Sequence, residues 1–299
     1  MANRKTLPGG IIAAAVSPRR SREYSVDLAA SLELIDFLYE AGVDGIALLG
    51  STGEFVHFML EDRARMLDFA VKRSRLPILV NVSHSTLDGA ILLGEEAVGS
   101  GVAAVLLMPP YYFRYDQQTI RTFCLKFADA VAKAVPVYLY NIPVFTSPFA
   151  LETALELLAT GAFAGIKDSS GDVDFIQKLI APRNFHVFNG DDRVFVKMRR
   201  AGADGAVTGV ACALPELMVK LDKAVRDGDT GRVQQLEKYV YEFLDWFDRF
   251  PCPIVIKEAV KLRKIGAGVH STPLSEEGAR NLEAFGVWFK DWLPGVLKA

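Results

Sequence analysis

The chain has 299 residues, 51% of them apolar and 23% charged, with a formal net charge of −2. This composition allows a sizeable buried core, and the absence of a basic tract excludes nucleic-acid binding through the phosphates. No apolar run reaches the roughly 18 residues that span a bilayer. The N-terminal residues lack the apolar segment of a secretion signal, and the cysteines number three, so we expect a cytoplasmic protein with reduced thiols.

Eight short apolar runs, each ending in small or polar residues, are predicted to be strands. In chain order they lie within residues 9–17, 40–50, 77–83, 99–110, 136–143, 159–169, 185–190 and 200–210. Helical patterns separate them at residues 26–41, 61–75, 86–99, 117–134, 150–160, 172–181 and 191–201. In four of the runs a glycine lies where a helix ends, which is typical of a left-handed closing residue.

Strands that are apolar throughout indicate a parallel sheet that is covered by helices. Eight strand–helix units in succession predict an α/β fold, a (β/α)8 TIM barrel. A doubly wound open sheet is the alternative, but no glycine-rich phosphate turn follows the first strand. Beyond residue 214 the pattern is helical. We expect a barrel over residues 1–227 and a C-terminal helical extension over residues 228–299, whose basic stretch 257–264 is interpreted as a solvated helix face.

In such a barrel the active site lies where the strands end. Lys167 ends the sixth predicted strand, where burial favours a neutral amine that attacks ketones to form a Schiff base. Tyr140, at the end of the fifth strand, can shuttle protons. The alternatives are an ion pair of Lys167 with Asp168 or a distant carboxylate, and a simply packed tyrosine.

Ser51 and Thr52, after the second strand, offer hydroxyls and backbone N–H groups to a carboxylate, although such a run is often only a tight turn. Together with the lysine and tyrosine they predict an enzyme that acts on an α-keto acid. His84 is weighed as a substrate contact or a loop residue without a role. The histidines are isolated and no Cys-x-x-Cys occurs, so we expect no metal and no cofactor.

Six motifs carry a family resemblance: GSTGE, PPYYF, YNIP, GIKDSSGD, NGDD and AGADGAVTGV. In order and spacing they resemble the dihydrodipicolinate synthase/N-acetylneuraminate lyase family over nearly the whole chain. The resemblance implies a pyruvate-dependent Schiff-base aldolase on a (β/α)8 barrel. It implies that Lys167 forms the imine, that Tyr140 is catalytic, and that Ser51 and Thr52 hold the pyruvyl carboxylate and relay protons. It further implies that Tyr112 is lent across a subunit interface in a homotetramer assembled from dimers.

The second substrate is the open question, because Phe145 stands where synthase members carry a carboxylate-binding arginine. A phenyl ring cannot replace that charge-assisted contact. We therefore expect reversible aldol cleavage or condensation of pyruvate with a small neutral or hydroxylated aldehyde, in sugar-acid or keto-acid metabolism. Condensation with aspartate semialdehyde, as in 4-hydroxy-tetrahydrodipicolinate synthase, is the first alternative, and a non-catalytic keto-acid-binding barrel is the second. The expected substrate contacts are Ser51, Thr52, Gly53, Phe145, Ser169, Gly190, Asp191 and Val207.

Two further interpretations concern loops beside the predicted site. Leu60, Ser85 and Gly89 stand where regulated synthases carry polar and acidic residues, so we expect no feedback inhibition by lysine. Of the neighbouring carboxylates Asp191 and Asp192, one is expected to cap a helix and the other to contact substrate hydroxyls.

Overall fold

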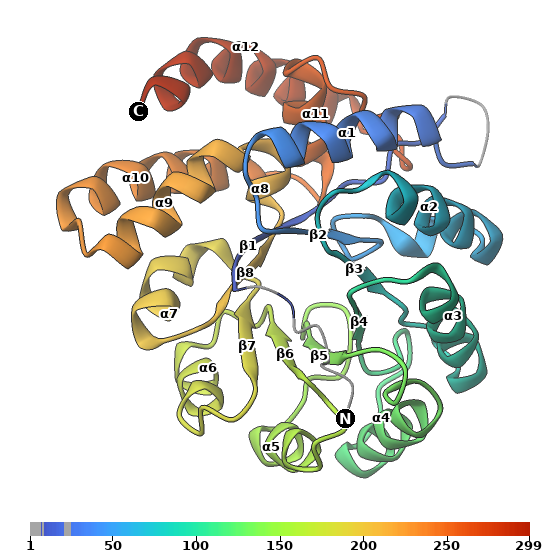
Figure 1. Cartoon of the computed structure of the whole chain (residues 1–299). Helices are drawn as coiled ribbons and strands as arrows, with labels where there is room; N and C mark the ends of the chain where they lie inside the picture. Colours follow the sequence, from blue (N-terminus) through green and yellow to red (C-terminus); the bar gives the residue numbers. More distant parts are fainter. Residues whose placement is uncertain (1–6, 8, 21–24) are drawn as a thin grey trace. The chain divides into compact units, whose positions relative to one another are not determined.

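The computed structural model describes residue 7, residues 9–20 and residues 25–299. Eight strands follow one another in chain order around a closed barrel (Figure 1). The pairs β1–β2 and the successive pairs from β3 to β8 are parallel. The strands are β1 Gly10–Ala14, β2 Gly45–Leu48, β3 Ile78–Asn81, β4 Ala104–Leu107, β5 Val137–Asn141, β6 Gly165–Asp168, β7 His186–Asn189 and β8 Gly205–Thr208. The predicted (β/α)8 barrel is confirmed.

Helices connect the strands, close to the predicted positions. They are α1 Leu28–Glu40, α2 Leu60–Arg73, α3 Leu87–Ser100, α4 Gln117–Val131, α5 Leu151–Ala159, α6 Val173–Ile180, α7 Phe195–Ala201, α8 Val210–Ala213 and α9 Pro215–Asp227. The 3₁₀ turns η1 Phe55–His57 and η2 Asp192–Val194 precede α2 and α7. The helix predicted over residues 191–201 is therefore shorter, since its first turn is the separate η2. The short α8 was not predicted.

One compact unit contains Pro77–Val207. In it, helices α3 to α7 lie outside the strands β3 to β7 (Figure 1). Each residue of β5 and β6 is buried, as expected of strands in a parallel sheet that helices cover, and this burial includes Lys167 and Asp168 of β6. The register of these two strands sets Tyr140 beside Lys167 and Asn141 beside Asp168. The two residues predicted to be catalytic are thus neighbours in one sheet.

The second compact unit contains Ile11–Leu76 and Thr208–Ala299. Its C-terminal helices are α10 Thr230–Phe247, α11 Ile254–Leu262 and α12 Glu276–Lys298. The aromatic side chains of α10 pack against α12, where Trp288 and Trp292 stack with ring centres 4.6 Å apart. The Trp292 indole N–H donates to Glu242 at 2.7 Å. The aromatic stretch at residues 239–250 is therefore a packing surface between helices.

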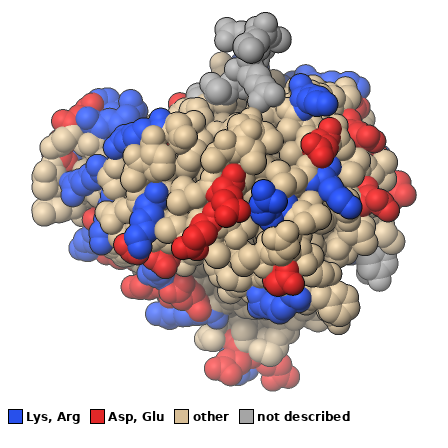
Figure 2. Space-filling model, turned by 90° about the horizontal axis from the view of Figure 1, so that it is seen from below, with Lys and Arg blue, Asp and Glu red and all other residues tan. Residues whose placement is uncertain are grey.

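The surface charges agree with the small net charge of the chain. On the face drawn in Figure 2, the Lys and Arg side chains of the described residues are interspersed with Asp and Glu. Among the described residues, no helix combines the length and apolar character that a membrane span requires.

Candidate active site

Lys167 is the third residue of β6, and only 5% of its surface is exposed. Its Nζ lies 4.0 Å from the centre of the Tyr140 ring on β5. At this distance the negative face of the ring attracts an ammonium group. Tyr140 is itself 1% exposed, so both side chains are held by the surrounding core. The structure brings together the two residues predicted to carry the chemistry.

Gly190, directly after β7, leaves the space that the Lys167 side chain occupies. A Cβ at Gly190 would lie 2.9 Å from Lys167 Cε and 2.1 Å from Ser169 Oγ. The Gly190 N–H donates to the backbone oxygen of Asp168 at 2.6 Å, which fixes this close approach. Ser169 and Gly190 therefore adjoin the lysine, whereas their contact with substrate stays a prediction.

Asp168 is held by residues other than Lys167. Its Oδ2 accepts a hydrogen bond from Asn141 Nδ2 at 2.6 Å, and its Oδ1 accepts from the Ser170 backbone and hydroxyl at 3.0 and 2.5 Å. Burial is the largest influence on this carboxyl and raises its pKa, while the three hydrogen bonds oppose that shift. The alternative of a Lys167–Asp168 ion pair is thus not what the structure shows.

The loop that carries Phe145 is fastened to residues 111–115. Tyr111 forms a bridge with Thr146, the Arg114 guanidinium donates to the Thr146 backbone oxygen, and the Tyr115 N–H donates to Ser147 Oγ at 2.8 Å. Phe145 is 54% exposed. Arg114 therefore anchors the loop through the residue that follows Phe145.

Tyr112 lies on the same fastened segment and is 86% exposed. Its φ of 82° lies in the left-handed region, which is uncommon for a bulky residue and costs roughly 1–3 kcal/mol. Its ring packs edge-on against Phe113 with the centres 4.9 Å apart. The strained backbone directs a large aromatic side chain outward from this unit.

Asp191 and Val207 have local structural roles. Asp191 Oδ1 accepts from the Arg193 N–H at 3.0 Å and caps η2, so Asp191 is the capping member of the aspartate pair. Val207 is 1% exposed within β8 and forms part of the core. Their predicted contacts with substrate are not contradicted and stay predictions.

The second unit holds the loop with the predicted carboxylate-binding hydroxyls, Ser51 and Thr52. Two non-glycine residues bracket this loop in the left-handed region, Leu49 with φ 56° and Glu54 with φ 50°. Each costs roughly 1–3 kcal/mol. A Cβ at Gly53 would lie 2.9 Å from Leu49 Cα, so only glycine allows the turn to fold back this closely. The loop is thus a tight turn, and both hydroxyl residues are half-buried.

Lys257 of α11 binds the residue that ends this loop, Glu54, and sequence reasoning missed it. The expectation of a solvated helix face at residues 257–264 is wrong for Lys257, which is 1% exposed. Its Nζ lies 2.7 Å from Glu54 Oε2 and donates to the Val269 backbone oxygen at 2.9 Å. The apolar run Ile254–Ile256 directly before it is the signal that could have indicated burial.

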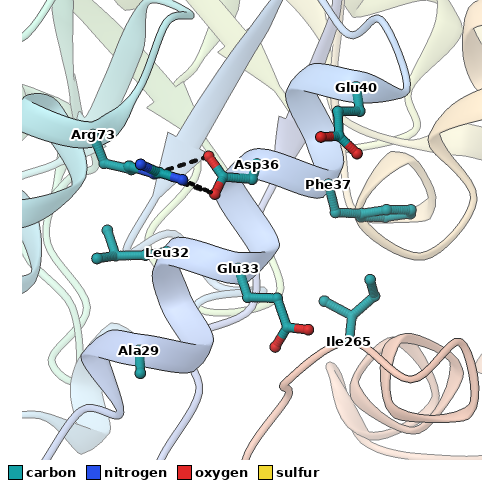
Figure 3. A pocket seen from close by; sticks show the side chains of 8 residues that line it. All are labelled: Ala29, Leu32, Glu33, Asp36, Phe37, Glu40, Arg73 and Ile265. Carbon is teal, nitrogen blue, oxygen red and sulfur yellow. Dashed lines mark hydrogen bonds and ion pairs between the residues drawn. The ribbon is translucent and has the colours of Figure 1, made fainter.

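In the part of the chain that the structure describes, neither a metal-binding cluster nor the hollow beside α1 competes with these residues. Among the described residues, no group of three or more His, Cys, Asp or Glu could hold a metal ion. One hollow of about 520 Å³ lies between α1, α2 and Ile265 in the second unit (Figure 3). There Arg73 Nε donates to Asp36 Oδ1 at 3.0 Å, and Glu33 accepts from the Gly266 N–H at 3.1 Å. None of the predicted site residues lines it.

Comparison with known proteins finds a family model and relatives that match most of the chain. The model of the "Dihydrodipicolinate synthetase family" matches residues 7–285. The 4-hydroxy-tetrahydrodipicolinate synthase of Salinibacter ruber is 35% identical over 74% of this chain and 74% of its own length.

Two solved structures share the fold over nearly their full length. Dihydrodipicolinate synthase from Aquifex aeolicus has a TM-score of 0.88 at 25% identity, covering 95% of this chain and 98% of its own. The sialic acid aldolase of Ruminococcus gnavus has a TM-score of 0.88 at 24% identity, covering 97% and 100%. The similar structures thus include both a synthase and an aldolase.

Proposed function

Because this chain belongs to the dihydrodipicolinate synthetase family, we propose that it is a lyase that forms a Schiff base between Lys167 and pyruvate or a related 2-keto acid. The family and the enzyme class predicted from the sequence motifs are confirmed by the match over residues 7–285. The individual residue roles and the second substrate are our proposal.

The chemistry begins with attack of Lys167 Nζ on the C2 carbonyl of pyruvate, which gives a carbinolamine. Protonation of its hydroxyl expels water and leaves the imine. Loss of a proton from the pyruvyl methyl group gives an enamine, whose carbon attacks the aldehyde carbonyl and forms the new carbon–carbon bond. Hydrolysis of the imine releases the product and regenerates the amine. Aldol cleavage is the same sequence reversed.

Tyr140 is proposed to move the protons of carbinolamine formation and breakdown, because its ring is in contact with the attacking amine. Ser51 and Thr52 are proposed to hold the pyruvyl carboxylate through their hydroxyls and backbone N–H groups. Tyr112 is proposed to extend the proton relay into a neighbouring subunit. Gly53, Gly190 and Val207 would shape the space around the keto acid.

The observation that carries this proposal is the burial of Lys167 against Tyr140 in the space left open by Gly190. Burying a charged ammonium group costs free energy, which favours a functional reason for a lysine at this position. Asp168, its neighbour in sequence, is engaged by Asn141 and Ser170 instead. A non-catalytic keto-acid-binding barrel would not need an amine at this position, so that alternative is disfavoured.

For the second substrate we propose a neutral or hydroxylated aldehyde, because the exposed ring of Phe145 offers no charge to a carboxylate. Ser169 and Asp191 can form hydrogen bonds with substrate hydroxyls, Asp191 through Oδ2, since its Oδ1 caps η2. Condensation with aspartate semialdehyde is the alternative, which the printed name of the Salinibacter ruber relative favours. In that case the exposed Arg114 on the adjoining segment would be the nearest replacement for the missing arginine.

A side-by-side measurement of kcat/KM separates these two functions. Aspartate semialdehyde, glyceraldehyde, glyoxylate and N-acetylmannosamine are each offered with pyruvate to the same preparation. Our proposal expects a neutral or hydroxylated aldehyde to be the best partner. A clear preference for aspartate semialdehyde would contradict it and establish the synthase alternative.

Assembly and location complete the proposal. We propose a homotetramer of dimers in the cytoplasm, with Tyr112 at the interface within each dimer. In support, Tyr112, Phe113 and Val144 are large apolar side chains that are 86%, 65% and 73% exposed. Exposed apolar patches of this kind mark protein contacts. Sedimentation should give the mass of four chains, and a monomer at micromolar concentration would contradict the assembly.

A further inference from the structure

The hydroxyl-bearing loop after β2 is held by a buried ion pair with the C-terminal helical region. Glu54 is 7% exposed and Lys257 1% exposed, and the carboxylate and ammonium groups lie 2.7 Å apart. The Val269 backbone oxygen accepts a second hydrogen bond from Lys257. The other oxygen of Glu54 lies 3.4 Å from His57 Nδ1. Both charged groups are therefore partnered inside the protein.

The same helix also reaches the surroundings of Thr52. A Cβ at Gly209 would lie 2.7 Å from Ile256 Cδ1 and 3.2 Å from Thr52 Oγ1, so both side chains border the space above this glycine. Ile256 directly precedes Lys257 on α11. Consecutive residues of one helix thus flank Thr52 and bind Glu54.

The loop needs such support because its backbone is strained. Leu49 and Glu54, at its two ends, both have left-handed φ angles, and strained residues persist only where their surroundings hold them. A buried ion pair is costly to form because both charged groups lose their hydration, and their attraction often does no more than offset this cost. Stability alone is therefore a weak reason for such a pair. Its position at the end of the loop suggests a role in orientation.

We propose that Lys257 is a positioning residue for the keto acid: its ammonium group fixes Glu54 and thereby orients the Ser51 and Thr52 hydroxyls toward the substrate carboxylate. The inference rests on the proposed function, in which these hydroxyls hold the pyruvyl carboxylate. It makes the C-terminal helical region part of the substrate-binding apparatus, although that region supplies no group to the reacting atoms.

The experiment uses the full-length protein and four variants. Lys257→Met and Glu54→Gln each remove one charge, and the double variant Lys257→Met/Glu54→Gln removes both without leaving an unpaired buried charge. Lys261→Met, on the same helix, is the matched control, since its ammonium is exposed and pairs with Glu258. Each protein is titrated with pyruvate and reduced with borohydride, and the half-saturating concentration and the plateau of modification at Lys167 are measured with the melting temperature.

If Lys257 positions the loop, its removal should weaken the binding of pyruvate but leave the formation of the imine at Lys167 intact. Lys257→Met should raise the half-saturating pyruvate concentration about ten- to a hundredfold, since small misplacements of binding groups have effects of this size. Modification of Lys167 should still reach its plateau at high pyruvate. The double variant should regain the melting temperature but not the affinity, because paired removal of buried charges is often neutral for stability. Lys261→Met should behave as the wild type.

An unchanged half-saturating concentration in folded Lys257→Met, or in the double variant, would overturn the positioning role and leave a purely structural ion pair. Should Lys257→Met fail to fold, the double variant decides alone. Absence of any modification in the wild-type protein would instead overturn the proposed Schiff base, and the inference with it. The two failures are therefore distinguished by the wild-type titration.

Discussion

Replacing Asn141 by alanine should weaken the protein, because this buried amide joins the two strands of the catalytic residues to the Phe145 loop. Asn141 Nδ2 donates to Asp168 at 2.6 Å, and its Oδ1 accepts from the Phe149 N–H at 3.1 Å. A hydrogen bond to a charged group is worth about 1.5–3 kcal/mol, and an unsatisfied buried N–H costs about 1–3 kcal/mol. We expect the free energy of unfolding to fall by about 3–5 kcal/mol, which lowers the melting temperature by roughly 6–12 °C.

The loss of stability in Asn141→Ala should also depend on pH, because the protonation of Asp168 sets the strength of its hydrogen bond with Asn141. Burial raises the pKa of Asp168 and the Asn141 hydrogen bond lowers it, so the variant should raise this pKa further. The destabilisation is then fully present at pH values above the pKa of Asp168 in the variant. The loss of stability becomes smaller as the pH falls through the pKa of Asp168, because a protonated carboxyl group accepts a weaker hydrogen bond from the Asn141 amide than the carboxylate does.

Differential scanning calorimetry at several pH values measures both effects. Gln117→Ala is the matched control, since the Gln117 side chain also makes two hydrogen bonds to this loop, with Pro148 and Ala150, from a more exposed position. It should cost about 1 kcal/mol or less. An Asn141→Ala protein as stable as the control, or a loss that does not change with pH, would refute the reasoning.

Three further predictions concern the reaction and the stability of the protein. Tyr140→Phe should keep its fold by circular dichroism while kcat falls roughly 10²–10⁴-fold, and a fully active variant would remove Tyr140 from the proton relay. Phe145→Arg should raise kcat/KM for aspartate semialdehyde in steady-state assays, and an unchanged value would contradict the assigned role of residue 145. Free lysine should not inhibit the wild type, and inhibition would contradict the interpretation of Leu60, Ser85 and Gly89. Contact with the Asp204 carboxylate, whose Oδ1 lies 3.5 Å from His186 Nδ1, raises the pKa of the His186 imidazole. At Asp204, burial raises the pKa of the carboxyl but is outweighed by the contact with His186 and the hydrogen bond from the Val187 N–H, so this pKa is lowered. This contact stabilises the fold in full between the ordinary pKa of aspartate and the ordinary pKa of histidine. Its contribution is lost as the pH rises through the raised pKa of His186 or falls through the lowered pKa of Asp204. His186→Gln should lower the melting temperature more at pH 5.5 than at pH 8.5, whereas an equal loss at both values would exclude this linkage.

The strands and the first catalytic residues were predictable because their signals are local. An apolar run that ends at Ile166 is followed directly by Lys167, Asp168 and two serines. Such a change from apolar to polar residues marks the end of a buried strand. The same reasoning found Tyr140 one strand earlier. The order of strands in a barrel implies that β5 pairs with β6, and the register that the structure shows then sets Tyr140 beside Lys167.

The Glu54–Lys257 pair could not be predicted in this way because 203 residues separate its partners. Helical periodicity assigns charged residues to the solvent, and it has no means of identifying a distant carboxylate that makes burial of Lys257 tolerable. The family resemblance singled out Tyr112, but its left-handed backbone could not be predicted, since no glycine or asparagine stands there to indicate it.

Peptide mapping after reduction with pyruvate and borohydride tests the central claim most directly. Two lysines of the described residues are deeply buried: Lys257 pairs with Glu54, whereas the Lys167 amine lies against the ring of Tyr140. The account predicts one reduced pyruvyl group per chain, on the peptide that contains Lys167. Modification of another lysine, or of none, with pyruvate and related 2-keto acids would contradict it.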